Sequence, residues 1–154
     1  MQTVSKLRMF ILRQFIAVLT TILGLLVFTS CEPQIQNEIP YVFVEIDINL
    51  NNVEFVNLQK DGGFVYILGG VRGIIIYRKN LSTYKAFERN SPVNPSSACA
   101  VLDVDDSGLF IIDPCSQALF DFDGNPINGI SPFPLRQYIT ILDNNWLYIR
   151  SESF

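Results

Sequence analysis

The side chains in this chain that can do covalent or redox chemistry are few, because its 154 residues include three cysteines and no histidine. Histidine is the commonest general acid or base of enzymes and the usual activator of a nucleophilic serine or cysteine. It is also a frequent ligand of zinc and iron. We therefore expect a non-catalytic protein, and attention falls on the thiols of Cys31, Cys99 and Cys115.

Cys31 follows a segment with the composition of a secretory signal. Residues 1–14 contain three basic residues and no acid, residues 15–28 carry no charge, and Thr29 and Ser30 precede the cysteine. A positive start, a short apolar stretch and small residues before a cleavage point are typical of a signal peptide. The cysteine directly after the small residues resembles the signal of bacterial lipoproteins, in which the thiol is acylated and becomes the first residue of the mature chain.

This resemblance implies a signal peptide over residues 1–30, a tether over residues 31–38 and a folded domain over residues 39–154. The lipid would hold the protein in the cell envelope of a Gram-negative-type bacterium, in the outer membrane or at the periplasmic face of the inner membrane. An uncleaved anchor is one alternative, but a transmembrane helix needs about 20 apolar residues, and Arg13 interrupts the run. Ordinary secretion is the other alternative.

The part of the chain after the predicted signal is acidic, with 15 acidic and 8 basic residues and a formal net charge of −7. Such a surface repels phosphate backbones, and no basic stripe is present, so we expect no nucleic-acid partner. Attachment to the membrane must then depend on the lipid anchor rather than on attraction to anionic lipid. An envelope protein or a glycan remains as the partner, and the sequence does not choose between them.

Cys99 and Cys115 are left as an even pair if Cys31 is acylated. In an oxidising compartment a disulfide is the default expectation for such a pair. On the loop-entropy estimate, closing a loop of about 15 residues contributes ~3 kcal/mol of stability. Two free thiols are the alternative.

Short runs of β-branched and aromatic residues, separated by Gly, Asp and Asn turns, make up the rest of the chain. Residues 41–50 settle into strict alternation, with Ile46, Ile48 and Leu50 on one face, which is the period of a half-buried strand. Residues 52–59 are the one segment that predicts a brief helical turn. The other expected strands are residues 64–68, 74–78, 84–88, 99–104, 109–112, 118–122, 135–142 and 146–150. About nine short strands at this spacing predict an all-β sandwich or barrel.

Two loops interrupt these strands and carry a family pattern. Residues 113–121, Asp-Pro-Cys-Ser-Gln-Ala-Leu-Phe-Asp, resemble the second cluster loop of Rieske-type iron–sulfur domains, which commonly reads Cys-Pro-Cys-His-Gly-Ser-x-Phe-Asp. Residues 86–93, Ala-Phe-Glu-Arg-Asn-Ser-Pro-Val, resemble the approach to the first cluster loop. The similarity extends over about residues 38–150 and continues downstream through Gly124, Gly129, Pro134, Leu135 and Tyr138.

Rieske-type domains are all-β proteins that hold a [2Fe–2S] cluster with two cysteines on one iron and two histidines on the other. On this register Ser91 and Asp113 occupy the cysteine positions, and Val93 and Ser116 occupy the histidine positions. Valine cannot donate to iron, and neutral serine hydroxyls are poor substitutes for thiolate or imidazole. We therefore expect these four ligand positions to be vacant and the protein to bind no metal and no cofactor.

The resemblance also implies that Cys115 is the extra cysteine that many family members pair with the first loop, and Cys99 is its plausible partner here. An alternative keeps a redox role, through an unconventional [2Fe–2S] site or through the pair of Cys99 and Cys115. That reading has little support from the sequence, because no CxxC motif or adjacent lysine is present to lower a thiol pKa.

The fold implied by the resemblance is a Rieske-like sandwich of antiparallel sheets with a small subdomain of the cluster-binding type, preceded by an N-terminal signal helix. The implied function is that of a non-catalytic binding or structural module of the envelope that works through residues 90–97 and 113–118. Phe133, between two prolines, is a candidate docking residue, with a packed loop aromatic as the alternative. If the register is a coincidence, the chain is an unrelated β-sandwich with the same tether and disulfide.

Overall fold

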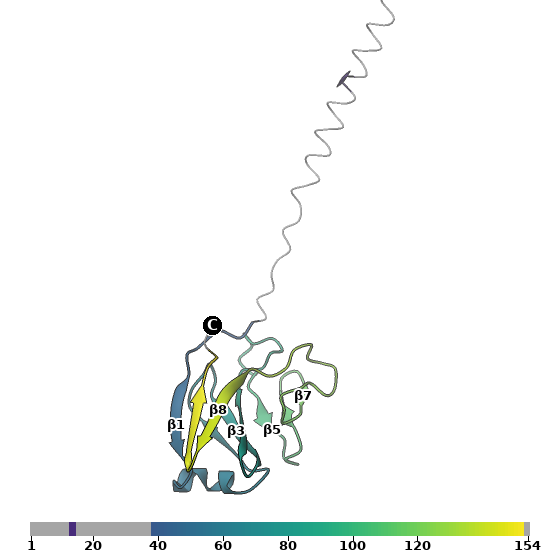
Figure 1. Cartoon of the computed structure of the whole chain (residues 1–154). Helices are drawn as coiled ribbons and strands as arrows, with labels where there is room; N and C mark the ends of the chain where they lie inside the picture. Colours follow the sequence, from purple (N-terminus) through teal and green to yellow (C-terminus); the bar gives the residue numbers. More distant parts are fainter. Residues whose placement is uncertain (1–12, 15–37, 153–154) are drawn as a thin grey trace, which may run out of the picture. The chain divides into compact units, whose positions relative to one another are not determined.

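The structure, a computed structural model, describes residues 13–14 and 38–152 (Figure 1). The predicted lipidation site Cys31 and nearly all of the predicted signal peptide and tether lie outside these residues. Within the described part of the chain, no helix is both long enough and apolar enough to cross a bilayer.

Residues 38–152 form two antiparallel sheets, which confirms the all-β prediction. The larger sheet has six strands in the order β1-β9-β8-β4-β3-β2, and the smaller sheet has three strands in the order β5-β6-β7. The elements are β1 (Glu45–Asn49), the 3₁₀ helix η1 (Val53–Gln59), β2 (Phe64–Ile67), β3 (Ile74–Asn80), β4 (Thr83–Glu88), β5 (Asp103–Val104), β6 (Ile111–Ile112), β7 (Leu119–Phe120), β8 (Gln137–Asp143) and β9 (Trp146–Arg150).

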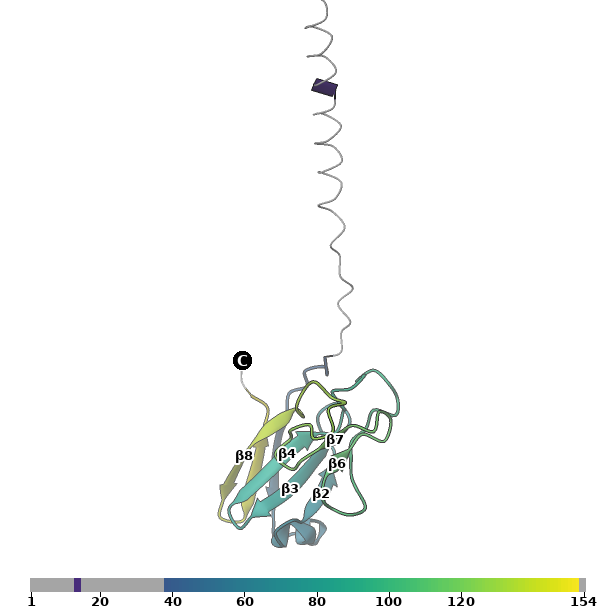
Figure 2. The ribbon, with the colours of Figure 1, turned by 90° about the vertical axis from the view of Figure 1, so that its right-hand side faces the viewer.

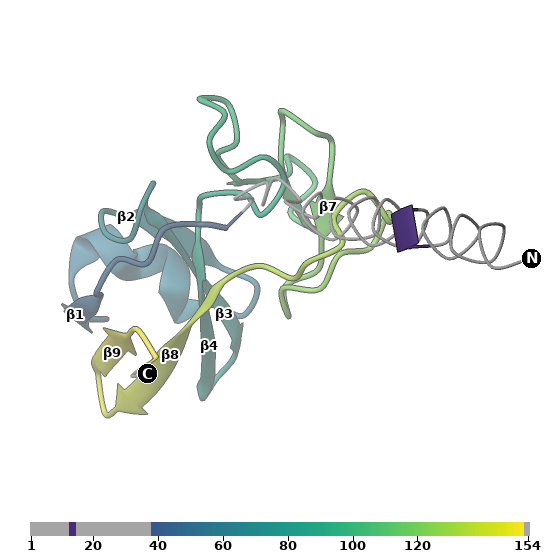
Figure 3. The same ribbon diagram turned by 90° about the horizontal axis from the view of Figure 1, so that it is seen from above.

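The six-stranded sheet curls into a half-barrel because β8 changes partner along its length. Gln137 and Tyr138 pair with β4, whereas Ile139 and the residues after it pair with β9. Seen from above, the strands surround the first of two cores, with β1 and β2 at the free edges of the sheet (Figure 3). The predicted helical turn is confirmed as η1, which places Phe55 and Leu58 in this core.

Strands β3 and β4 are buried on both faces. Ile74, Ile75 and Ile76 are all fully buried; the first and third belong to the core inside the half-barrel, and Ile75 belongs to the second core on the outer face. Ala86 and Phe87 divide in the same way between the two cores. Because successive side chains of a strand point to opposite faces, an unbroken apolar run is what two-sided burial requires.

The small sheet is inserted between β4 and β8 and packs on the outer face of β3 and β4 (Figure 2). Its strands have only two residues each, so the predicted strands 99–104, 109–112 and 118–122 were too long. Hydrogen bonds within the turns account for the difference. The carboxylate of Asp121, for example, accepts the backbone N–H groups of Asp123 and Asn125, and so ends β7 in a turn.

The pairing of the strands places the loops that connect them at two opposite ends of the domain. Glu45 pairs with Arg150, Ile67 with Ile74, and Ile74 with Glu88, so the segments next to these residues leave the sheet on one side (Figure 1). We call this side the loop end, made of residues 38–44, 68–73, 89–99, 130–136 and 151–152. The opposite side, the helix end, consists of η1 with residues 50–52 and 60–62 and the turns at residues 80–83 and 143–146.

Candidate functional site

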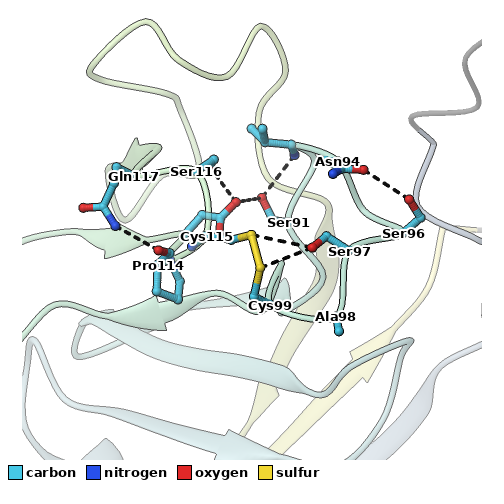
Figure 4. The surroundings of a disulfide bond; sticks show 12 residues. Ser91, Asn94, Ser96, Ser97, Ala98, Cys99, Pro114, Cys115, Ser116 and Gln117 are labelled. Carbon is cyan, nitrogen blue, oxygen red and sulfur yellow. Dashed lines mark hydrogen bonds between the residues drawn. A yellow bond between two sulfur atoms is a disulfide. The ribbon is translucent and has the colours of Figure 1, made fainter.

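The candidate site lies where the two loops singled out by the family pattern meet. The first loop follows β4, and the second loop connects β6 to β7. The structure joins them by a disulfide between Cys99 and Cys115, whose Cα atoms are 5.4 Å apart (Figure 4). Both cysteines are exposed, and the hydroxyl of Ser97 lies 3.2 Å from the sulfur of Cys99 and 3.6 Å from that of Cys115.

Beneath the disulfide, Asp113 forms a buried hydrogen-bonded network with two serines. The hydroxyls of Ser91 and Ser116 each donate to its Oδ2 atom at 2.7 Å, and the backbone N–H of Cys115 donates to Oδ1 at 2.8 Å (Figure 4). Ser91 and Asp113 are fully buried. A carboxyl group without such partners would be costly to bury, so these three donors account for its presence in the interior.

Val93, the fourth predicted ligand position, joins this network through its backbone only. Its N–H donates to the hydroxyl of Ser91 at 3.1 Å. Its side chain is partly buried and packs against the second core. The structure thus brings together all four positions, three of them by their side chains.

These residues do not fit a [2Fe–2S] cluster. The oxygen donors of Ser91, Asp113 and Ser116 are engaged with one another, and Val93 has no donor atom in its side chain. Among the residues described by the structure, no group of three or more cysteine, aspartate or glutamate side chains gathers closely enough to hold a metal ion.

The contact between Ser91 and Asp113 also does not make a nucleophile. The carboxyl group touches the serine hydroxyl, which is the arrangement of a base and a nucleophile. Both residues are nevertheless fully buried, so a substrate has no access to the hydroxyl. The network therefore joins the two loops.

A second buried carboxyl group, that of Glu88, holds the start of the first loop and was not predicted from the sequence. Glu88 is fully buried and accepts four hydrogen bonds. The hydroxyl of Tyr138 donates to Oε2 at 2.7 Å, and the other donors are the backbone N–H groups of Val71, Arg72 and Asn90. Burial, with the adjacent carboxyl group of Glu88, raises the pKa of the Tyr138 hydroxyl. The signal available in the sequence was alternation along β4, which puts Glu88 on the same face as buried Ala86.

Gly70 is required next to this group. Its φ is +60°, and a Cβ atom there would collide with Oε2 of Glu88 and with the hydroxyl oxygen of Tyr138. Both the backbone conformation and the available space therefore demand glycine. Gly70 thus marks a close approach of the backbone to a buried carboxyl group.

The two ends of the first loop are fastened by Arg89 and Tyr66. The guanidinium of Arg89 lies over the Tyr66 ring, 4.3 Å from its centroid, and its Nε atom donates to the carbonyl of Leu102 at 3.0 Å. The Tyr66 hydroxyl donates to the carboxylate of Asp103. Burial, followed by this hydrogen bond to Asp103, raises the pKa of Tyr66 to about 12.

A pocket of about 390 Å³ at the helix end is a weaker candidate. Its polar lining includes the amides of Asn51, Asn144 and Asn145. Turn geometry explains one of these amides, because Asn144 has a φ of 53° between two paired strands and asparagine tolerates that conformation. Its charged residue, Arg78, is engaged with Asp61 at 3.1 Å. We assign no ligand to this pocket.

The chain is thus an all-β protein with two disulfide-joined loops packed over a buried Ser–Asp–Ser network. In comparisons with known proteins, no family model and no curated protein matches the chain.

Proposed function

We propose that the chain is a membrane-anchored lipoprotein of the cell envelope, carrying a Rieske-like domain that has lost its iron–sulfur ligands. It acts as a non-catalytic binding or structural module. Its lipid attachment is at Cys31, in the outer membrane or at the periplasmic face of the inner membrane, and its partner is an envelope protein or a glycan.

The contact between Ser91 and Asp113 is the observation that carries the Rieske-like part of this proposal. The register assigns both positions to the cysteines that bind one iron, and ligands of one iron must lie close together. Two residues separated by 22 positions in the sequence are in direct contact, at 2.7 Å. Ser116, assigned to a histidine position, is bonded to the same carboxyl oxygen. The insertion of a small sheet between β4 and β8 also agrees with a subdomain of the cluster-binding type.

The network supports a binding role because it keeps the two loops ordered without a cluster. The disulfide joins the loops on the outside, and the carboxyl group of Asp113 joins them on the inside. The exposed residues around the disulfide include the polar, uncharged Asn94, Ser96 and Gln117 as well as Ala98 and Pro114 (Figure 4). The guanidinium of Arg72 donates to the carbonyls of Ala98 and Pro95 in the same loop. A surface of this composition offers hydrogen-bonding groups to a polypeptide or a glycan.

Metal analysis tests the proposed loss of the cluster. The full chain, purified anaerobically in detergent and offered cluster-assembly conditions, should contain almost no iron and no acid-labile sulfide while retaining a folded β spectrum. About two irons per chain would contradict it, since that is the content of a [2Fe–2S] centre.

A Cys31→Ala variant tests the anchor separately. The variant should leave the membrane fraction and appear in the soluble envelope fraction, because the acylated thiol is the proposed attachment. Persistent attachment would favour an uncleaved apolar helix. A Cys99→Ala variant serves as the matched control, because this exchange also removes one cysteine yet leaves the proposed anchor intact.

A redox role is the second candidate, favoured by one observation. Cys99 and Cys115 are both exposed, and the hydroxyl of Ser97 contacts both sulfur atoms. Exchange would require an external dithiol that is oxidised to a disulfide as this pair is reduced to two thiols. Equilibration with defined ratios of reduced and oxidised dithiothreitol tests it. If the pair remains a disulfide at the reduction potentials that typical structural disulfides withstand, the result would count against this role.

A further inference from the structure

Several exposed apolar side chains lie on the segments of the loop end. Phe43 is 68% exposed, Leu68 is 94% exposed and Phe133 is 54% exposed, with Val42 and Ile130 also exposed. They belong to three segments that leave the sheet on the same side, before β1, after β2 and before β8 (Figures 1 and 3). Single exposed apolar residues are normal on protein surfaces, whereas a group of them marks an interaction site.

Exposure alone does not distinguish this end from the other. At the helix end, Val53 is 87% exposed and Leu81 is 78% exposed. A choice between the two ends therefore needs a second observation, and the point at which the chain enters the domain provides one.

The chain enters at the loop end and is fixed there. Ile39 is buried, and the guanidinium of Arg136 donates to the carbonyls of Ile39 and Pro40 at 2.6 and 2.7 Å. The seven residues between Cys31 and Ile39 can span roughly 25–30 Å when fully extended. A lipid on Cys31 would consequently keep the loop end, where the chain enters the domain, within that distance of the bilayer.

We propose that the loop end rests on the lipid bilayer, with Phe43, Leu68 and Phe133 inserted at its interface. This inference rests on the proposed lipid anchor. Aromatic and leucine side chains are the groups that amphipathic surfaces bury at the boundary between headgroups and acyl chains. Each contact is weak by itself, but a short tether raises the effective concentration of the surface to the millimolar range, so weak contacts suffice.

The charged groups at this end have both signs. Glu38 and Glu152 are exposed there, whereas the guanidinium groups of Arg72, Arg89 and Arg136 all donate to backbone carbonyls. Because neither sign dominates, the surface suits zwitterionic lipid, such as phosphatidylethanolamine or phosphatidylcholine.

The single tryptophan of the chain offers a built-in reference for a depth measurement. Trp146 begins β9 at the helix end, whereas Phe43 precedes β1 at the other end of the same strand pair. Trp146 pairs with Asn49, and Phe43 lies six positions before Asn49, which corresponds to about 20 Å of extended chain. Quenching of tryptophan fluorescence by brominated phosphatidylcholine can therefore report which end touches the bilayer.

The experiment uses the full lipidated chain in vesicles of brominated phosphatidylcholine. Two variants carry the probe at the loop end, Trp146→Phe/Phe43→Trp and Trp146→Phe/Phe133→Trp. The unsubstituted protein and a Trp146→Phe/Leu81→Trp variant carry it at the helix end as matched controls. All of the replaced side chains are exposed, so the substitutions leave both cores unchanged.

We expect the loop-end probes to lose roughly half of their fluorescence in brominated vesicles and the helix-end probes to lose almost none, because interfacial burial reaches about 5–10 Å into the bilayer. Flotation of the vesicles distinguishes a failure of the docking inference from a failure of the proposed lipid anchor. Protein that floats with unquenched loop-end probes overturns the docking inference and leaves the anchor intact. Protein that does not float overturns the anchor and the docking inference together.

Discussion

The hydroxyl of Ser91 lies 2.7 Å from the carboxyl group of Asp113, and both residues are fully buried where two loops meet. Ser116 and the backbone of Cys115 complete the set of donors to the same group. The carboxyl group therefore organises both loops, and the consequences of removing it can be predicted.

Asp113→Ala should lower the free energy of unfolding by about 3 kcal/mol, because buried donors on Ser91 and Cys115 lose their acceptor. Urea denaturation followed by circular dichroism would measure the change. Asp106→Ala is the matched control, since it removes an exposed carboxylate and should change stability by less than about 0.5 kcal/mol. Equal effects of the two substitutions would show that the buried network contributes little.

Restoring the four ligand positions tests the register itself. A variant with Ser91→Cys, Val93→His, Asp113→Cys and Ser116→His should bind a [2Fe–2S] cluster on anaerobic reconstitution, with two irons and two sulfides per chain and visible absorbance. Occupancy should be partial, because the side chain of Val93 packs against the second core. A variant that keeps Asp113 and carries the other three changes is the control and should bind much less iron. A folded fourfold variant without iron would contradict the Rieske-like register.

Gly70→Ala should destabilise the protein by about 3 kcal/mol, because it adds the strain of a positive φ to a collision with Glu88 and Tyr138. Gly108→Ala separates these two contributions. Gly108 has a φ of +70°, and a Cβ atom added there would meet nothing within 4 Å, so only the backbone strain applies. We expect a loss of about 1 kcal/mol for that control. Losses of the same size at both positions would show that Glu88 moves aside.

Stability should fall as the pH rises above 10, because Tyr66 and Tyr138 both have raised pKa values in the folded protein. Between a pKa of 10 in the unfolded chain and about 12 for folded Tyr66, the unfolded state has fewer bound protons than the folded state. The linkage relation then gives a stability that is complete below pH 10 and decreases through the folded pKa.

Thermal unfolding between about pH 8 and pH 11.5 would measure this dependence of stability on pH. Tyr66→Phe and Tyr138→Phe should each flatten the alkaline decline, although each also removes a hydrogen bond and lowers stability at neutral pH. An unchanged slope in the double variant would assign the decline to other groups.

Much of the local structure could be predicted from patterns within short segments. The alternation of Ile48 and Leu50 placed both side chains in the core, and the segment after them forms the expected helical turn. β9 has the predicted bounds. These features depend on the periods of strands and helices, which a sequence displays directly.

The short strands of the small sheet and the network around Glu88 were decided only by the tertiary structure. Residues 99–102 have the composition of a strand, yet Val101 forms only an isolated bridge with Asn90, and Cys99 is joined to Cys115 of the second loop. Glu88 lies at the end of an apolar strand, and nothing near it in the sequence indicates that Tyr138, 50 residues later, will donate to it.

The sequence by itself therefore determined the all-β class and most of the strand positions, and it singled out the two loops that the proposed family register assigns to ligand positions. The tertiary structure decided that Ser91, Asp113 and Ser116 fill this place with hydrogen bonds to one another. The physical reason is that burial of a polar group depends on partners supplied by distant segments. Those partners come within hydrogen-bonding distance only when the pairing of β4 with β8 and of β6 with β7 is set.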